Sequence, residues 1–184
     1  ICTDKTGTLT QNKMKVIQDE SNNQKLLAEA MALCSDAEIG EDDIEAIGEP
    51  TEAALVNFAN KIGLPKYKLE QEAPRIGEAP FDSMRKMMST VHNKNEKIIQ
   101  YTKGACEILL ERSTHYLDKD GQVVQMTEEI KQEVRRKNKE FADKALRLLG
   151  AAYREHDQVP ENFDAENLEK DLTFIGFVGM IDPC

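Results

Sequence analysis

The chain has 184 residues, of which 40% are hydrophobic and 32% charged, and its 24 basic and 34 acidic side chains give a net charge of −10. A chain of this length can bury the core of one globular domain, or of one domain with a piece of another, but it is too short for a transporter or a multidomain enzyme. No apolar run reaches the roughly 18 to 20 residues that span a bilayer. The negative charge argues against a polyanionic partner such as DNA or RNA.

The four cysteines and three histidines are dispersed, and no Cys-x-x-Cys pair is present. This spacing argues against a zinc site or a disulfide framework, and reduced thiols fit the cytoplasm. The chain starts at Ile1 without a targeting peptide and stops in an Asp-Pro turn. We therefore expect it to be a piece of a longer protein.

The first elements can be predicted from local pattern. Residues 1–10 are expected to form a β-prone start and a polar turn, and 13–16 to resume as a strand. A helix is predicted behind Asn22 or Asn23, either of which can cap it, because apolar residues recur there at helical spacing. A second helix is expected to begin near Pro50, since proline is tolerated in a first helical turn.

Strand patterns dominate the middle of the chain. Residues 88–92 and 98–102 are separated by an Asn-rich turn and predict a hairpin. Three further predictions follow in chain order: a short helix over 105–112, a longer helix capped by Thr127, and strands over 148–153 and 172–181. Because helices and strands do not alternate one for one, we predict an α/β mixture of the α+β type, with an antiparallel sheet flanked by helices.

The N-terminal segment carries the motif Asp4-Lys5-Thr6-Gly7-Thr8 directly after the strand-like start. A carboxylate at the end of a strand, followed by a glycine turn, lies where α/β sheets bind ligands. The neighbouring hydroxyls and ammonium can donate to phosphate oxygens, and Mg²⁺ would offset the repulsion between carboxylate and phosphate. The alternative is a polar turn in which Asp4 only caps the backbone.

The sequence DKTGTLT, continued as QNKM to Met14, resembles the phosphorylation motif of the P-type ATPases. Further motifs of that family follow in family order, namely Gly48–Leu55, Pro80–Ser83 with Arg85 and Lys86, Lys103–Ala105, Ala145–Arg147 and Gly179–Pro183. The resemblance implies that Asp4 takes the γ-phosphate of ATP and that Thr6 helps to arrange Mg²⁺ and phosphate. We assign Asp4, Lys5 and Thr6 to catalysis, and Asp4 and Thr6 to the metal site.

Phe81 offers a candidate surface for a purine base. Arg85 and Lys86 follow it closely, so an aromatic face stands next to positive charge. Six basic and three acidic residues lie between Arg75 and Lys103, a local net charge of +3 within a chain of −10. This reversal fits a triphosphate site. Without the neighbouring motifs, a core ring following a proline would be an equal interpretation of Phe81.

Lys103 ends a predicted strand, and the break at Gly104 would let a ligand approach the backbone while the ammonium reaches it. By resemblance, Lys103 lines the adenine pocket, Glu52 hydrogen-bonds near the adenine, and Arg147 reaches the phosphates from the far side of the cleft. Each residue also has a purely structural interpretation: a solvated lysine at a strand end, an acid in the first turn of a helix, and a surface arginine.

Other candidate ligands are weaker. The acidic run Glu41–Asp43 lacks the spacing and glycine of an EF-hand loop, so a solvated face is the better interpretation. The methionines are most simply filler in the core.

These features predict the ATP-binding domain of a type II P-type cation pump, similar to the calcium-transporting branch, on the cytoplasmic face of a membrane. Residues 1–12 would be the edge of the phosphorylation domain, 13–175 the nucleotide-binding domain and 176–184 a return strand. The expected cofactors are ATP and Mg²⁺, and the expected partners are the phosphorylation, actuator and membrane domains of the parent.

Two alternatives stay open at this point: a self-contained phosphotransferase that uses Asp4, and a nucleotide-binding module in which Asp4 is a bystander. Phosphatases with an aspartate nucleophile need a second acid where this chain has Thr6, which argues against the first alternative. Cys184 stands where the family usually continues Asp-Pro-Pro, and the second acidic motif of the Mg²⁺ site lies outside the sequence. The chain alone is therefore expected to bind nucleotide without turnover.

Overall fold

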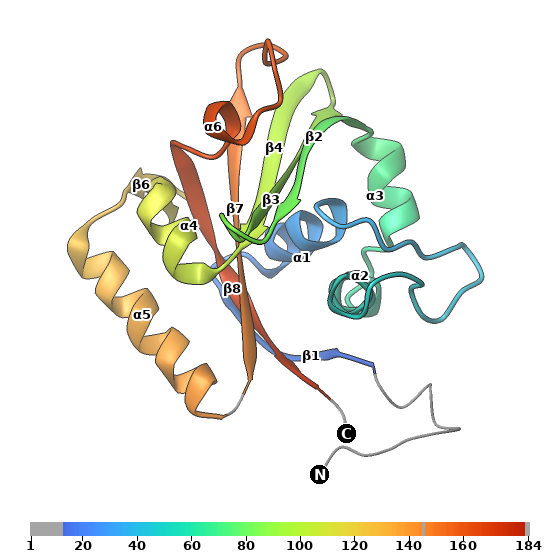
Figure 1. Cartoon of the computed structure of the whole chain (residues 1–184), viewed down its shortest axis with the longest axis horizontal. Helices are drawn as coiled ribbons and strands as arrows, with labels where there is room; N and C mark the ends of the chain where they lie inside the picture. Colours follow the sequence, from blue (N-terminus) through green and yellow to red (C-terminus); the bar gives the residue numbers. More distant parts are fainter. Residues whose placement is uncertain (1–12, 145, 183–184) are drawn as a thin grey trace.

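The computed structural model describes residues 13–144 and 146–182, which form one twisted sheet with helices on both faces (Figure 1). The strands are β1 (Lys15–Ser21), β2 (Arg75–Asp82), β3 (Met87–Lys94), β4 (Lys97–Gly104), β5 (Ser113–Leu117), β6 (Val123–Gln125), β7 (Arg147–His156) and β8 (Leu172–Ile181). The helices are α1 (Gln24–Leu33), α2 (Pro50–Lys61), α3 (Lys66–Glu72), α4 (Cys106–Arg112), α5 (Glu128–Asp143) and α6 (Ala165–Leu168).

The sheet order is β2-β3-β4-β7-β8-β5-β6, and β1 pairs with β8 off this path. Every pairing is antiparallel except β5 with β8, whose chain directions agree. A parallel pair needs a long crossover connection, and here the segment from β6 through α5 and β7 supplies it. The predicted α+β fold is confirmed, with this one parallel pairing added to the expected antiparallel sheet.

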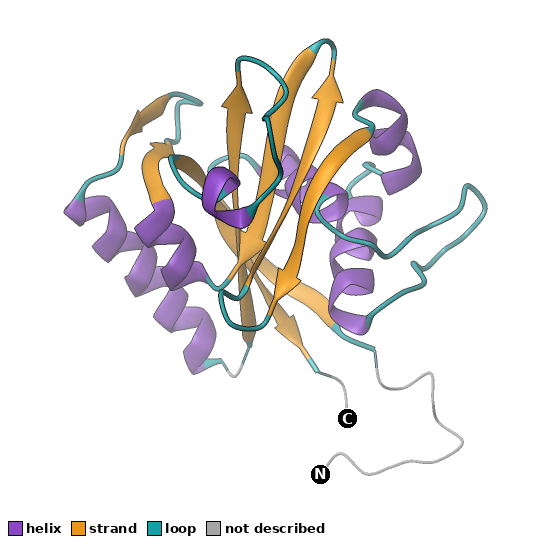
Figure 2. Cartoon of the chain, turned by 45° about the horizontal axis from the view of Figure 1, so that its top comes forward, coloured by secondary structure: helices purple, strands orange, loops and turns teal. Residues whose placement is uncertain are grey.

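Each face of the sheet has its own core, and Figure 2 shows helices on both sides of the strands. Helices α1, α2 and α3 pack on the face that carries Met88 and Tyr101. Helices α4 and α5 pack on the opposite face against Phe174 and Phe177, where the rings of Phe141 and Phe177 meet edge to face at 4.9 Å. Because successive side chains of a strand point to opposite faces, β8 contributes to both cores and is buried along nearly its whole length.

Several elements were predictable because their signals are local. Asn23 Oδ1 accepts the Leu26 N–H at 3.1 Å, and Thr127 Oγ1 accepts the Ile130 N–H at 3.1 Å, so both predicted caps begin helices. The hairpin β3–β4 turns at Asn95 and Glu96, whose φ angles of 53° and 68° are those of a type I′ turn. The strand predicted over 172–181 coincides with β8.

Five elements were not predicted: α3, β2, β5, β6 and α6. Strand β2 contains Pro80, which cannot donate to a ladder and is tolerated because β2 is the edge strand. The other four are short, and β5 pairs with the distant strand β8, whereas β6 is a three-residue strand that only extends β5 in a local hairpin. No helix within the two described ranges is long and apolar enough to cross a membrane.

His92 is buried beside α3, where its Nδ1 lies 2.8 Å from the Ala73 carbonyl oxygen and its Nε2 2.8 Å from Thr90 Oγ1. Burial, helped by the charges of Arg75 and Lys66, lowers the pKa of His92 from 6.5 to about 4. The fold therefore keeps the imidazole neutral, whereas the unfolded chain binds a proton below pH 6.5.

Stability should accordingly fall as the pH drops from 6.5 to 4, with a contribution from His92 of up to about 3 kcal/mol. Denaturant unfolding at several pH values should show a shallower acid decline for His92→Gln than for the unsubstituted chain. Equal declines in the two proteins would show that another group controls acid unfolding.

Candidate functional site

A cavity of about 490 Å³ opens on the α1–α3 face, where α2 begins and β2 and β4 end. Its lining combines acidic, basic, aromatic and aliphatic side chains from six parts of the chain. The lining residues are Asp36, Glu49, Thr51, Glu52, Phe81, Met88, Lys103, Gly104 and Leu149. Met88 and Lys103 are cross-strand partners in β3 and β4, so the floor of the cavity is the sheet itself.

An almost buried ion pair joins the sheet to α2. Lys103 is only 6% exposed, and its Nζ donates to Glu52 Oε2 at 2.6 Å and to Ser35 Oγ at 3.1 Å. The other carboxylate oxygen of Glu52 accepts the Asp36 N–H at 3.1 Å. Glu52 lies in the first turn of α2, where the helix dipole favours a negative charge. An ammonium has three donors, and the described residues take two of those on Lys103.

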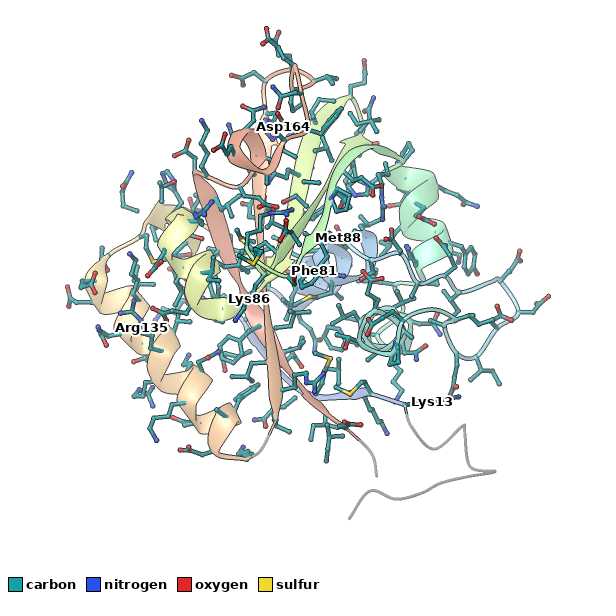
Figure 3. All side chains as sticks on the ribbon, viewed as in Figure 1. Lys13, Phe81, Lys86, Met88, Arg135 and Asp164 are labelled. Carbon is teal, nitrogen blue, oxygen red and sulfur yellow. The ribbon has the colours of Figure 1, made fainter. Side chains whose placement is uncertain are left out.

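Phe81 forms the aromatic part of the lining. Its side chain is 60% exposed, although large aromatic side chains are usually covered in a monomer. Figure 3 shows Phe81 next to Met88, which also lines the cavity. An exposed ring beside a nearly buried ion pair gives the cavity one flat apolar surface and one polar edge.

Gly104 is required by a close backbone approach. A Cβ atom at this position would lie 2.5 Å from the Lys86 carbonyl oxygen and 2.7 Å from Met87 Cγ. The glycine therefore lets the turn before β3 pack against the end of β4, where the Ala105 N–H donates to the same Lys86 carbonyl at 3.2 Å. A larger residue would push this turn, and with it the Phe81 segment, away from the cavity.

Residues 23–184 match the family described as P-type ATPase, cytoplasmic domain N. The chain belongs to this family. Over its whole length it is 43% identical to Calcium-transporting ATPase 1 of Bacillus cereus, 39% identical to Calcium-transporting ATPase 1 of Lactococcus lactis and 37% identical to a calcium-transporting ATPase of Listeria monocytogenes. It spans 22% of the length of each of these relatives.

In this N domain, four residues predicted from the sequence line one cavity: Glu52, Phe81, Lys103 and Gly104. The other predicted nucleotide ligands do not line it. The Arg85 guanidinium binds Glu169, Lys86 is exposed with φ 57°, and Arg147 is exposed at the start of β7.

Asp4, Lys5 and Thr6 lie outside the described residues, so their catalytic and metal roles stay predictions. Within the described ranges no group of three or more His, Cys, Asp or Glu side chains could hold a metal ion. The predicted boundary at residue 176 falls inside the continuous strand β8.

Two basic side chains hold the loop after α1, which carries Asp36. The sequence did not predict this role for either of them. Lys66 is fully buried, and its Nζ donates at 2.6 Å to the carbonyl oxygens of both Ser35 and Ala37. Arg75 Nη2 donates to the Leu33 carbonyl oxygen at 3.1 Å and to that of Ser35 at 2.9 Å. Nothing local in the sequence distinguishes Lys66 from the solvated lysines around it, since its acceptors lie about 30 residues away.

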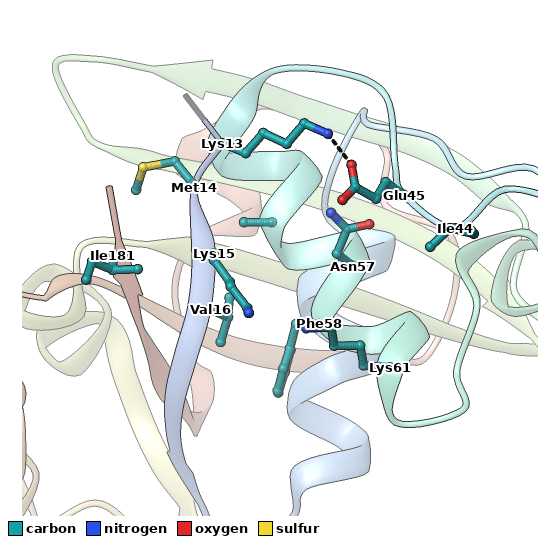
Figure 4. Close-up of a pocket in the computed structure, with 11 residues that line it drawn as sticks. Lys13, Met14, Lys15, Val16, Ile44, Glu45, Asn57, Phe58, Lys61 and Ile181 are labelled. Atoms are coloured by element: carbon teal, nitrogen blue, oxygen red, sulfur yellow. Dashed lines mark hydrogen bonds and ion pairs between the residues drawn. The ribbon is translucent and has the colours of Figure 1, made fainter. Parts of the chain in front are cut away.

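A second hollow of about 310 Å³ lies between β1, α2 and the 44–45 loop (Figure 4). It shares no lining residue with the first cavity, and the Lys13–Glu45 ion pair at its rim is exposed. Its one aromatic side chain, Phe58, also packs against the core around α1 and α2. The buried charge and the exposed ring that favour ligand binding therefore belong to the first cavity.

Proposed function

We propose that this N domain binds ATP in the cavity at Phe81. In this arrangement adenine stacks on the Phe81 ring, and the hydrogen-bonding edge of the base lies at Lys103 and Glu52. The observation that carries the proposal is the combination of an exposed aromatic ring with a nearly buried ion pair in one cavity. Stacking on an aromatic side chain is worth roughly 1 to 3 kcal/mol per base.

The polar side chains at one edge of the cavity fit the hydrogen-bonding pattern of adenine. The ring nitrogens of adenine accept hydrogen bonds and its exocyclic amino group donates them. The Lys103 ammonium can donate to a ring nitrogen, while the carboxylates of Asp36, Glu49 and Glu52 can accept from the amino group. The acidic side of the cavity would repel phosphates, so the triphosphate would extend away from it toward solvent.

In the full-length parent, the ATP bound here would give its γ-phosphate to Asp4 and so drive cation transport. Mg²⁺ would be held by Asp4 and Thr6 and would neutralise charge on the transferring phosphate. The names of the relatives favour calcium as the cation, and the parent would place this domain on the cytoplasmic face of a membrane with its phosphorylation, actuator and membrane domains.

Titration of ATP into the 184-residue protein should give a dissociation constant of roughly 0.2 to 1 mM, because one stacked base and a few solvated contacts leave about −4 to −5 kcal/mol after the cost of immobilising the ligand. Amide NMR shifts are expected around Phe81 and Lys103. Submicromolar affinity, or shifts confined to the second hollow, would contradict this site.

A further inference from the structure

The segment that carries Phe81 leaves the regular ladder of the sheet. In β2 and β3, Ala79 pairs with Ser89 and Asp82 with Met87, and the register shifts between these two pairs. The shift falls on Pro80 and Phe81, and Pro80 has no N–H to donate. An irregularity of this kind releases a side chain from the alternation of the strand and re-aims it. The hydrogen-bond ladder between β2 and β3 therefore does not by itself fix the position of the Phe81 side chain.

Arg85 replaces the missing ladder contacts. Its side chain folds back across the turn, and Nη2 donates to the Pro80 carbonyl oxygen at 2.8 Å and to the Ala79 carbonyl oxygen at 3.3 Å. These carbonyl groups immediately precede Phe81 in the chain. A backbone hydrogen bond closes the turn itself, in which the Asp82 carbonyl oxygen accepts the Lys86 N–H at 2.7 Å.

Glu169 fixes the Arg85 guanidinium in turn. Arg85 Nε donates to Glu169 Oε1 at 2.6 Å, and Nη2 donates to Oε2 at 3.2 Å, so the contact is bidentate. The Glu169 side chain is 0% exposed, and Oε2 also accepts a hydrogen bond from Ser89 Oγ at 2.7 Å. A buried carboxylate held by a planar fork is much more rigid than an exposed ion pair.

The Arg85–Glu169 ion pair contacts the turn that carries Phe81 (the Phe81 turn) from the face of the sheet opposite the cavity. Ser89, which contacts Glu169, is the neighbour of Met88 on β3, so the two side chains point to opposite faces. Met88 points into the cavity, whereas Ser89 and Glu169 lie on the face with α6. An Arg85 that bound phosphate in the cavity would have to abandon a fully buried carboxylate, which is strongly unfavourable.

We propose that Arg85 and Glu169 are positioning residues that set the Phe81 ring for base stacking, and that Arg85 is not a phosphate ligand. This inference rests on the proposed function of the cavity. It assigns to Glu169, a residue remote from the cavity, a part in nucleotide affinity. It also predicts that affinity for the base alone depends on an ion pair that no nucleotide touches.

Arg85→Lys tests the inference, because lysine keeps the positive charge but loses the bidentate fork. Adenosine, AMP and ATP should all bind roughly three- to tenfold more weakly, a smaller loss than removal of the ring itself would cause. A direct phosphate contact would instead weaken ATP and leave adenosine unchanged. In a Phe81→Ala background, Arg85→Lys should cause no further loss, since its effect passes through the ring.

Arg154→Ala is the matched control. Arg154 is also half-buried and donates to carbonyl oxygens of the α6 segment, including those of Asn167 and Leu168, but it does not contact the Phe81 turn. This variant should bind adenosine like the unsubstituted protein. An equal loss in Arg154→Ala and Arg85→Lys would show general loosening around α6 and would overturn the inference.

A measurement without ligand completes the test. Amide hydrogen exchange at Met84 and Lys86, whose N–H groups donate to Asp82, should accelerate in Arg85→Lys and in Glu169→Gln but not in Arg154→Ala. If the unsubstituted protein binds no adenosine, the proposed function fails. If it binds and Phe81→Ala weakens binding while Arg85→Lys does not, only the positioning role is wrong.

Discussion

Phe81→Ala is expected to weaken ATP, ADP, AMP and adenosine by a similar factor, about tenfold or more, because a stacked base contributes roughly 1 to 3 kcal/mol. The ring would contact the base, which all four ligands share, so the number of phosphates should not change the factor. The ring is 60% exposed, and its removal should therefore cost the fold little. Titration followed by NMR measures the affinities, and thermal unfolding checks the fold.

The matched control for this experiment is Met84→Ala. Met84 is an exposed apolar residue on the same turn, 89% accessible, and it does not line the cavity. Its replacement should leave all four affinities unchanged. Unchanged nucleotide affinities in Phe81→Ala, with an intact fold, would remove the ring from the binding site.

The sequence predicted those elements whose causes lie within a few residues. Asn23 and Thr127 cap helices through contacts three residues away, and β8 is apolar enough to be recognised as a strand. The candidate site was partly predictable for a different reason. Glu52, Phe81 and Lys103 are of residue types that fit adenine, and the order of the family motifs predicted them as nucleotide ligands without any knowledge of the sheet that brings them to one cavity.

What the sequence could not show is the partner of each charge. Arg85 and Lys86 are adjacent and both positively charged, and both were assigned to the nucleotide. The fold separates them, because Glu169, 84 residues further along the chain, takes the Arg85 guanidinium while Lys86 stays exposed. Lys66 is a similar case, since only its buried carbonyl partners reveal that it supports the loop with Asp36. Pairings over such distances depend on tertiary packing, which local pattern does not encode.

The two ends of the described domain lie together. Strand β1 begins at Lys15, which pairs with Ile181 at the end of β8. The connections that would lead to the rest of the parent therefore leave from one end of the sheet. Such an arrangement allows the domain to be an insertion that moves toward a phosphorylation site as a unit. The proposed transfer of phosphate from bound ATP to Asp4 requires such an approach.

Asp4→Asn in the full-length parent is expected to abolish the acid-stable, hydroxylamine-sensitive phosphoenzyme formed from γ-phosphate-labelled ATP. A neutral amide is a poor nucleophile and cannot form the acyl phosphate that a carboxylate forms. Transfer also needs the γ-phosphate in line with the nucleophile and its charge neutralised by Mg²⁺. Nucleotide affinity should persist in this variant, because the proposed base contacts are made at Phe81 and Lys103.

The binding role proposed for Phe81 and the catalytic role proposed for Asp4 can be separated by varying the concentration of ATP. Phe81→Ala in the full-length parent should lower labelling at ATP concentrations below the dissociation constant and recover it at saturation, because the ring contributes binding and not chemistry. Asp4→Asn should remain unlabelled at every ATP concentration. Labelling that survives Asp4→Asn would place the phosphate on another residue, and labelling of the 184-residue chain by itself would favour the self-contained phosphotransferase over a domain that only delivers ATP.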